Sequence, residues 1–160
     1  MNDKLVVGIA DMKMARQNGM LITYALGSCI GICLYDPLIQ LAALVHIMLP
    51  LNMETGRKSP LKYADTGICE TLRRMETQGG SRARIVAKIA GGARMFETPG
   101  GGNLGNIGQR NIESTHMVLR REGIRLLRED VGGTGARTLL FDVASGQACV
   151  RSYGKPELIF

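Results

Sequence analysis

The sequence predicts an α+β fold, a layered α/β sandwich in which a mixed or mostly antiparallel sheet is joined by two main helices. Strand-like runs outnumber helical ones, and most of these runs adjoin each other along the chain. Short turn signals rich in glycine, proline and aspartate separate them. The strict alternation of strand and helix that is typical of parallel sheets is not seen.

Apolar and β-branched runs bounded by turn residues predict the strands. The predicted strands are residues 5–10, 21–26, 30–35, 41–49, 84–90, 124–131, 138–143 and 148–153. Gly27-Ser28-Cys29 separates the second strand from the third, and Asp36-Pro37 separates the third from the fourth.

Two segments have the periodicity of a helix. Between about residues 61 and 77, apolar or small side chains recur at the spacing of one helical face: Ala64, Ile68, Leu72 and Met75. The second helix is predicted at about residues 107–122, with Gly123 in the place of a C-terminal cap. Its buried stripe is predicted to be Ile112, Thr115 and Leu119.

Length and composition predict one domain covering residues 1–160, because 160 residues suffice for one sizeable core and would be cramped for two. The longest apolar run, residues 41–51, falls far below the roughly 20 residues that span a bilayer. No signal-peptide pattern precedes the first predicted strand. We therefore expect a cytoplasmic protein that does not insert into membranes.

Cysteine content and net charge indicate the cellular compartment and the class of partner. The four cysteines, with no export signal, are expected to be reduced thiols in a cytosol: Cys29, Cys33, Cys69 and Cys149. A net charge of +6 favours acidic partners. Nucleic acid is not the expected partner, because aromatic residues make up 4% of the chain and do not interleave with the basic ones.

The informative stretch runs from Thr23 to Pro50. If residues 30–35 and 41–49 form a hairpin centred near Pro37-Leu38, Cys29 and His46 lie directly opposite one another. Cross-strand partners have Cβ atoms about 4.5–5.5 Å apart and share a face of the sheet, so a thiol and an imidazole could pair there. A loop of odd length would place His46 on the other face.

A cysteine–histidine pair predicts nucleophilic chemistry, because the thiolate is the nucleophile and a neighbouring imidazolium lowers the thiol pKa. Gly27 and Ser28 suit a tight turn whose backbone N–H groups hold a developing oxyanion. Thr23 is placed to orient the imidazole. Each residue also has a structural interpretation: Cys29 as a small core residue, His46 as a satisfied buried histidine, and Thr23 as an ordinary strand residue.

A metal site is not expected. Cys29 and Cys33 lie four residues apart in a predicted strand, which separates them by about 13 Å at roughly 3.3 Å per residue. Two thiolates at that separation cannot bind one tetrahedral ion with Zn–S bonds of about 2.3 Å. No phosphate-loop or dinucleotide motif surrounds the glycines, so no cofactor is expected either.

Several separated motifs together resemble one known family. They are Leu26-Gly27-Ser28-Cys29-Ile30-Gly31 with Leu34-Tyr35-Asp36-Pro37, His46-Ile47-Met48-Leu49-Pro50, residues 88–96, Ile107-Gly108-Gln109-Arg110-Asn111-Ile112, and Glu129-Asp130-Val131-Gly132-Gly133. On these motifs the chain resembles the chemoreceptor glutamine deamidases known as CheD. The resemblance covers about residues 5–146.

The resemblance implies a protein-glutamine deamidase that converts glutamines of chemoreceptor cytoplasmic domains to glutamates. It places the catalytic cysteine, histidine and threonine on Cys29, His46 and Thr23. It also implies a fold like the catalytic domain of cytotoxic necrotizing toxins and, in some members, binding to a CheC-type phosphatase. The main alternative is a non-catalytic module that docks on the phosphatase and receptors. A thiol redox sensor is a third possibility, for which Cys33 is poorly placed.

Overall fold

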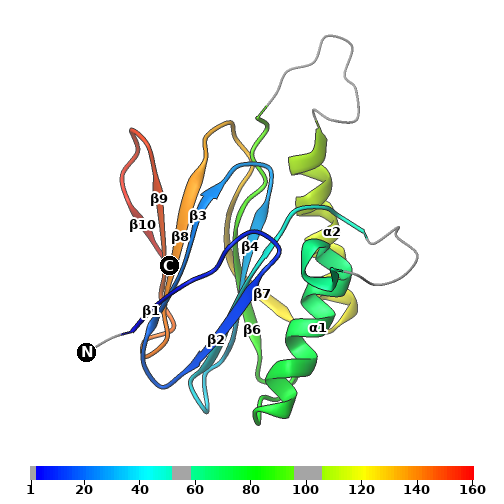
Figure 1. Ribbon diagram of the computed structural model, residues 1–160, viewed down its shortest axis with the longest axis vertical. Coiled ribbons are helices and arrows are strands. Elements are labelled where there is room, and N and C mark those ends of the chain that lie inside the picture. Colours follow the sequence, from blue (N-terminus) through cyan, green and yellow to red (C-terminus); the bar gives the residue numbers. More distant parts are fainter. Residues whose placement is uncertain (1–2, 52–58, 96–105) are drawn as a thin grey trace.

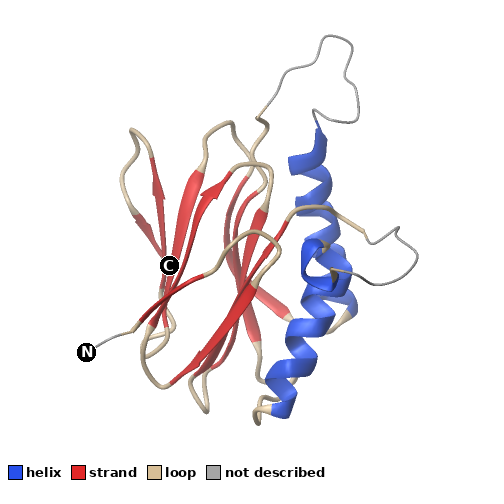
Figure 2. Ribbon diagram, in the orientation of Figure 1, coloured by secondary structure: helices blue, strands red, loops and turns tan. Residues whose placement is uncertain are grey.

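The structure is a computed structural model that describes residues 3–51, 59–95 and 106–160, and its elements stack in three layers (Figures 1 and 2). One five-stranded sheet has the order β1-β3-β8-β9-β10, and we call it the outer sheet. The other has the order β2-β5-β4-β6-β7 and lies between the outer sheet and the helices, so we call it the inner sheet. The predicted α+β sandwich with two helices is confirmed, and its strands divide between two mixed sheets.

The bounds of the elements follow the chain from the first strand to the last. The strands are β1 (Lys4–Val6), β2 (Met12–Arg16), β3 (Met20–Leu26), β4 (Ile30–Asp36), β5 (Leu41–Ile47), β6 (Val86–Gly91), β7 (Arg125–Val131), β8 (Arg137–Asp142), β9 (Ala148–Ser152) and β10 (Leu158–Ile159). The helices are the short 3-10 helix η1 (Pro60–Lys62), α1 (Ala64–Thr77) and α2 (Ile107–Arg121).

Two hydrophobic cores hold the layers together. Between the sheets, Leu21 and Leu139 of the outer sheet pack against Cys33 and Leu44 of the inner sheet. Between the inner sheet and the helices, side chains such as Ile32 pack against the faces of α1 and α2. Every residue of β4 and β5 is buried, because both faces of the inner sheet are covered. A polar side chain in these strands is therefore taken out of water and needs a partner inside the protein.

The helices form where the sequence predicts them. The α1 face predicted from the spacing of Ala64, Ile68, Leu72 and Met75 is buried. In α2 the predicted stripe of Ile112, Thr115 and Leu119 is buried as well, together with Gly108 and Asn111. Gly123, just after α2, has φ of +71°, the left-handed conformation that a helix C-terminus favours. In the described parts of the chain, neither helix has the length and apolar character needed to cross a bilayer.

The sequence does not predict β2 or β10, and it extends β1 too far. The residues of β2 are Met-Lys-Met-Ala-Arg, which include no β-branched or aromatic side chain. Antiparallel pairing with β5 from Met12↔Val45 to Arg16↔Leu41 forms this strand, so tertiary contact overrides propensity. β1 ends at Val6, and Ala10 has φ of +58° where the chain turns toward β2.

The side chains of the outer sheet come close to the backbone of β4 at Gly31. A Cβ atom at this position would lie 2.9 Å from Cδ2 of Leu139, 3.1 Å from Cδ1 of Leu26 and 3.3 Å from Cγ2 of Thr23. All three of these side chains belong to the outer sheet. The absence of a side chain at Gly31 therefore sets how near the outer sheet comes to the inner one.

We predict that Gly31→Ala destabilises the protein by about 1–3 kcal/mol, the usual effect of overpacking a dense core. The reason is that the added methyl group pushes Leu139 and Leu26 out of their packed positions. Urea unfolding followed by circular dichroism measures the change. Gly8→Ala is the matched control, because a Cβ at Gly8 meets nothing within 4 Å. Equal midpoints for the two variants would contradict the packing argument.

Candidate active site

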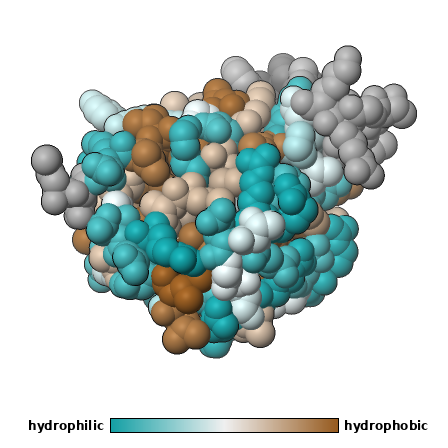
Figure 3. Space-filling view, turned by 60° about the horizontal axis from the view of Figure 1, so that its bottom comes forward, coloured by the Kyte–Doolittle hydropathy of each residue, from teal (hydrophilic) through white to brown (hydrophobic). Residues whose placement is uncertain are grey.

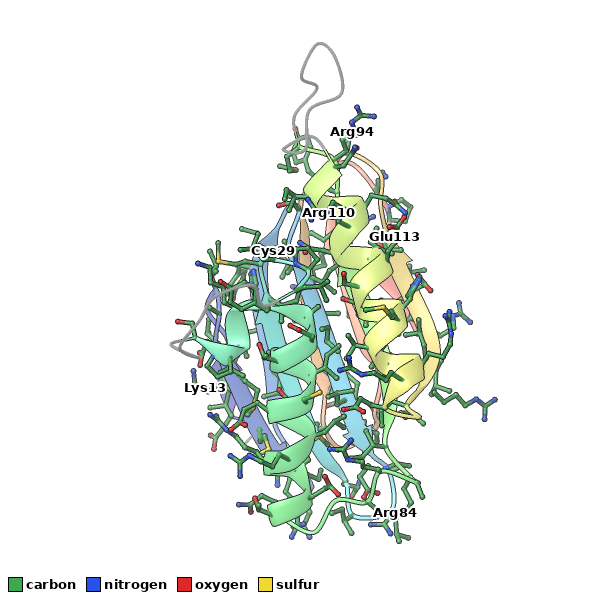
Figure 4. The ribbon with its side chains drawn as sticks, turned by 90° about the vertical axis from the view of Figure 1, so that its right-hand side faces the viewer. Lys13, Cys29, Arg84, Arg94, Arg110 and Glu113 are labelled. Carbon is green, nitrogen blue, oxygen red and sulfur yellow. The ribbon has the colours of Figure 1, made fainter. Side chains whose placement is uncertain are left out.

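Cys29 lies in the bend that joins β3 to β4, where the chain crosses from the outer sheet to the inner sheet. Its side chain is partly buried and packs against the core between the sheets. Figure 4 places it beside the N-terminal half of α2, near Arg110. The nucleophile predicted from sequence therefore lies at the edge of the inter-sheet core rather than within a strand.

The predicted hairpin register is wrong by two residues. β4 and β5 pair from Ile30↔Ile47 to Asp36↔Leu41, which leaves residues 37–40 in the turn and sets Gly31, not Cys29, opposite His46. The prediction centres the turn near Pro37-Leu38, one residue before the centre of the observed turn. Cys29 lies outside the paired strands and packs against the core between the sheets, the side on which Thr23 reaches His46.

Thr23 and His46 meet across the two sheets. Oγ1 of Thr23, in β3, lies 2.7 Å from Nδ1 of His46, in β5. Both residues are buried, with exposed fractions of 0% and 1%. The backbone of His46 is fixed on its other side, because its carbonyl accepts from the Ala10 N–H (2.9 Å) and its N–H donates to the Asp11 carbonyl (3.1 Å). The structure thus joins two of the three predicted site residues by a hydrogen bond.

A third group, the carbonyl of Val7, determines the protonation of the imidazole. The Thr23 hydroxyl donates to this carbonyl at 2.8 Å. A hydroxyl has one proton to donate, and a carbonyl has none. Thr23 must therefore accept from His46, so the proton is on Nδ1 and the lone pair is on Nε2. The Nε2 atom is buried and has no hydrogen-bond partner among the described residues, so it is available as a base.

Burial acts on both reactive groups. Desolvation lowers the pKa of His46 to about 4, because the imidazolium form loses hydration inside the protein. Burial also raises the pKa of Cys29, and the N–H of Cys29 itself opposes part of this rise. Near neutral pH the free protein therefore holds a neutral thiol and a neutral imidazole. The low-pKa thiolate expected from the sequence is not the resting state, because the imidazolium that would stabilise it is itself disfavoured.

Gly27 and Ser28, the residues predicted to supply backbone N–H groups, form the first part of the bend that contains Cys29. The Gly27 carbonyl accepts from the Ala93 N–H at 2.8 Å, and the Cys29 carbonyl accepts from the Gly92 N–H at the same distance. The segment that follows β6 therefore holds the bend from one side. Within the described residues, no backbone carbonyl accepts from the N–H groups of Ser28 and Cys29, and the Cys29 N–H interacts with its own thiol.

Sequence reasoning missed two contributors to this site. The Val7 carbonyl was not considered, because a backbone group leaves no signature in residue type. Asn111 belongs to one of the motifs that carry the family resemblance, but no role is predicted for it from sequence. Its side chain donates to the Ser28 carbonyl at 2.8 Å. An asparagine on the predicted apolar face of a helix, next to Ile112, was the signal that could have singled it out.

The remaining candidates lie apart from this site. Cys33 is fully buried opposite Leu44, and Cys69 and Cys149 donate to Glu122 and Glu157 at 2.9 and 2.8 Å. All four cysteines are free thiols. His116 pairs with Glu129 on the surface, 2.9 Å away. In the three described stretches, no group of three or more His, Cys, Asp or Glu side chains is arranged to hold a metal ion.

Comparison with known proteins gives a consistent result. A family model described as CheD chemotactic sensory transduction matches residues 48–152. A protein of Desulforamulus reducens is 45% identical over 156 residues, covering 97% of this chain and 94% of its own length. Relatives from Syntrophomonas wolfei (44% identity, 99% of each chain) and Thermococcus kodakarensis (41% identity, 96% of this chain and 95% of the relative) are similar over nearly their full lengths. All three are named "Probable chemoreceptor glutamine deamidase CheD".

The hydrogen-bond pattern predicts that His46 carries its proton on Nδ1 at neutral pH. Heteronuclear NMR of the imidazole nitrogens measures this directly, since a protonated and a bare nitrogen differ widely in chemical shift. Thr23→Val removes the hydroxyl acceptor and is expected to shift the population toward the other tautomer. Thr23→Ser keeps the hydroxyl and should preserve it. An Nε2-protonated ring in the wild type would contradict the assignment.

The two pKa shifts predict how the thiol responds to pH. His46 is neutral above about pH 4, and the Cys29 pKa is raised, so little thiolate forms until the solution is alkaline. The rate of Cys29 alkylation by iodoacetamide should therefore increase continuously with pH, reaching half its maximum above the roughly 8.5 of free cysteine. Peptide mass spectrometry identifies the alkylated residue. A rate plateau between pH 5 and pH 8 would instead reveal an ion pair.

Proposed function

Because the chain belongs to the CheD family, we propose that it is a chemoreceptor glutamine deamidase in which Cys29 is the nucleophile, His46 the general base and Thr23 the residue that orients His46. The observation that carries the proposal is the Val7–Thr23–His46 chain of hydrogen bonds, which leaves Nε2 of the imidazole as a free base. Cys29 packs against the core between the sheets, and the imidazole of His46 meets Thr23 in the same layer.

The first half of the reaction forms a thioester. The Cys29 thiol gives its proton to Nε2 of His46 while Sγ bonds to the carboxamide carbon of a glutamine, which produces a tetrahedral anion. Backbone N–H groups of the Gly27–Cys29 bend stabilise the anionic oxygen. The imidazolium then returns the proton to the amide nitrogen, the C–N bond breaks, and ammonia leaves.

The second half hydrolyses the thioester. A water molecule gives a proton to Nε2 as its oxygen bonds to the thioester carbon. The tetrahedral anion collapses, Sγ leaves and recovers the proton from the imidazolium, and the substrate departs as a glutamic acid side chain that releases its remaining proton to water. Throughout both halves Thr23 keeps the Nδ1–H bound and the ring in one orientation, so the same nitrogen serves twice. These steps use the three side chains, the backbone and water.

The positive net charge of the protein supports an acidic macromolecule of the cytoplasm as its substrate. The net charge is +6, and the exposed side chains of Arg94 and Arg110 lie on the same end of the molecule as Cys29 (Figure 4). Cys29 itself is partly exposed, so a side chain presented by another protein can reach it. On the opposite end, which holds the 37–40 turn, hydrophobic groups occur as separate patches among hydrophilic ones (Figure 3).

We predict that the protein converts specific glutamines of a chemoreceptor cytoplasmic fragment to glutamates, and that Cys29→Ala abolishes the conversion. Peptide mass spectrometry of the fragment, taken from the same organism, detects the change of amide to acid. Thr23→Val should slow the reaction on the order of 10²-fold, because the base loses its orientation. Thr23→Ser should retain most of the rate.

The alternative is a docking module that binds receptors and a CheC-type phosphatase without catalysis. Under that alternative, the receptor fragment keeps its mass with both the wild type and Cys29→Ala, while both proteins bind the phosphatase equally. Deamidation by the wild type alone excludes it. Phosphatase binding that accompanies deamidation would add a partner and leave the enzymatic proposal intact.

A further inference from the structure

Asn111 of α2 ties together the two segments that carry the candidate nucleophile and base. Its Nδ2 donates to the carbonyl of Ser28, the residue before Cys29, at 2.8 Å. It also donates to the carbonyl of Met48, two residues after His46, at 2.9 Å. Both acceptors are carbonyl oxygens, which cannot donate, so the nitrogen and not the oxygen of the amide must face them.

The close approach of α2 makes these bonds possible. Gly108 lies one turn before Asn111 on the same helical face, and a Cβ at Gly108 would be 2.4 Å from the Ala93 carbonyl oxygen and 2.6 Å from that of Gly92. The first turn of α2 therefore rests directly on the backbone that follows β6. The same backbone is the one whose N–H groups hold the bend at Cys29.

A peptide group is planar, and its C=O and N–H point in opposite directions when the bond is trans. No cis peptide occurs in the described residues. By holding the Ser28 carbonyl toward α2, Asn111 fixes the Cys29 N–H to point away from the helix. Among the described residues no backbone carbonyl accepts from that N–H, and its partner is the Cys29 thiol itself, so it is placed to bind an anionic oxygen beside Sγ.

We propose that Asn111 is a positioning residue that fixes the Ser28–Cys29 peptide so that the Cys29 N–H serves as an oxyanion donor. This inference rests on the proposed function, since it needs a tetrahedral anion at Cys29. Asn111 does not touch the substrate, because its side chain is fully buried. Its Oδ1 atom is also buried and has no hydrogen-bond partner among the described residues, an unfavourable arrangement that the two donated bonds offset.

Two reactions of the same thiol separate this role from general stability. Acylation of Cys29 by p-nitrophenyl acetate passes through a tetrahedral anion and needs the oxyanion donor. Alkylation by iodoacetamide displaces iodide directly and forms no oxyanion. In Asn111→Ala we expect the acylation rate to fall by roughly 10- to 100-fold relative to the alkylation rate, less than the loss of a whole oxyanion donor because the N–H is misaligned and not removed.

The matched control is Thr115→Val, one helical turn further along the same buried face of α2. Thr115 is fully buried and its Oγ1 has no hydrogen-bond partner among the described residues, so its side chain makes no hydrogen bond to the Cys29 bend. Its ratio of acylation to alkylation should stay within about threefold of the wild type. Asn111→Asp keeps the size of the side chain and replaces the NH2 donor by oxygen. It is the second variant to measure in case Asn111→Ala folds poorly, and it should show the same loss.

An unchanged ratio in both Asn111 variants would overturn the inference, and so would an equal fall in Thr115→Val. For receptor deamidation we expect kcat to fall with the ratio while KM stays nearly constant. The ratio of the acylation rate to the alkylation rate is measured without a receptor, so each of the two proposals can be contradicted on its own. If the wild type leaves the receptor fragment unchanged while Asn111→Ala lowers the ratio, the substrate proposal is wrong and the positioning role stands.

Discussion

The distance between the two sheets at Gly31 is the constraint on which the candidate site depends. Gly31 is paired with His46 in the inner sheet, and the outer sheet fills the space that a side chain would take. Because the sheets come this close, the hydroxyl of Thr23 reaches Nδ1 of His46 at 2.7 Å.

The hydrogen bond across the sheets has a defined direction because Val7 takes the only proton of the hydroxyl. Nδ1–H of His46 donates to the Thr23 hydroxyl, which donates to the Val7 carbonyl, and the lone pair of the imidazole is left on Nε2. In the proposed mechanism a threonine thus takes the place that a carboxylate has in many triads. Unlike a carboxylate, it adds no charge to stabilise an imidazolium, which agrees with the lowering of the His46 pKa by desolvation. The arrangement favours proton transfer during the reaction over a permanent ion pair.

The two faces of the inner sheet carry different parts of the structure. Its face toward the outer sheet carries His46, and its face toward the helices carries the core against which α1 and α2 pack. The bend at Cys29, the end of β5 and the segment after β6 meet at one end of this sheet, where α2 covers them. Three carbonyl groups of the bend are each bound, two by backbone N–H groups and one by Asn111. The geometry of a short bend is therefore determined by elements that follow it by more than sixty residues.

The sequence by itself determined the α+β class, both helices with their buried faces, and most strands, because hydrophobic periodicity and turn residues are local properties. It also predicted Cys29, His46 and Thr23 as the candidate site residues, and the structure joins Thr23 and His46 by a hydrogen bond. Only the tertiary structure decided the register that sets Gly31 opposite His46, the division of strands into two sheets, and the short strand β2. It alone decided the tautomer of His46 and the contact of Asn111 with Ser28, since both depend on a backbone carbonyl from another element. Backbone groups are the same at every position of the sequence, so their contribution appears only when folding gives each one a particular neighbour.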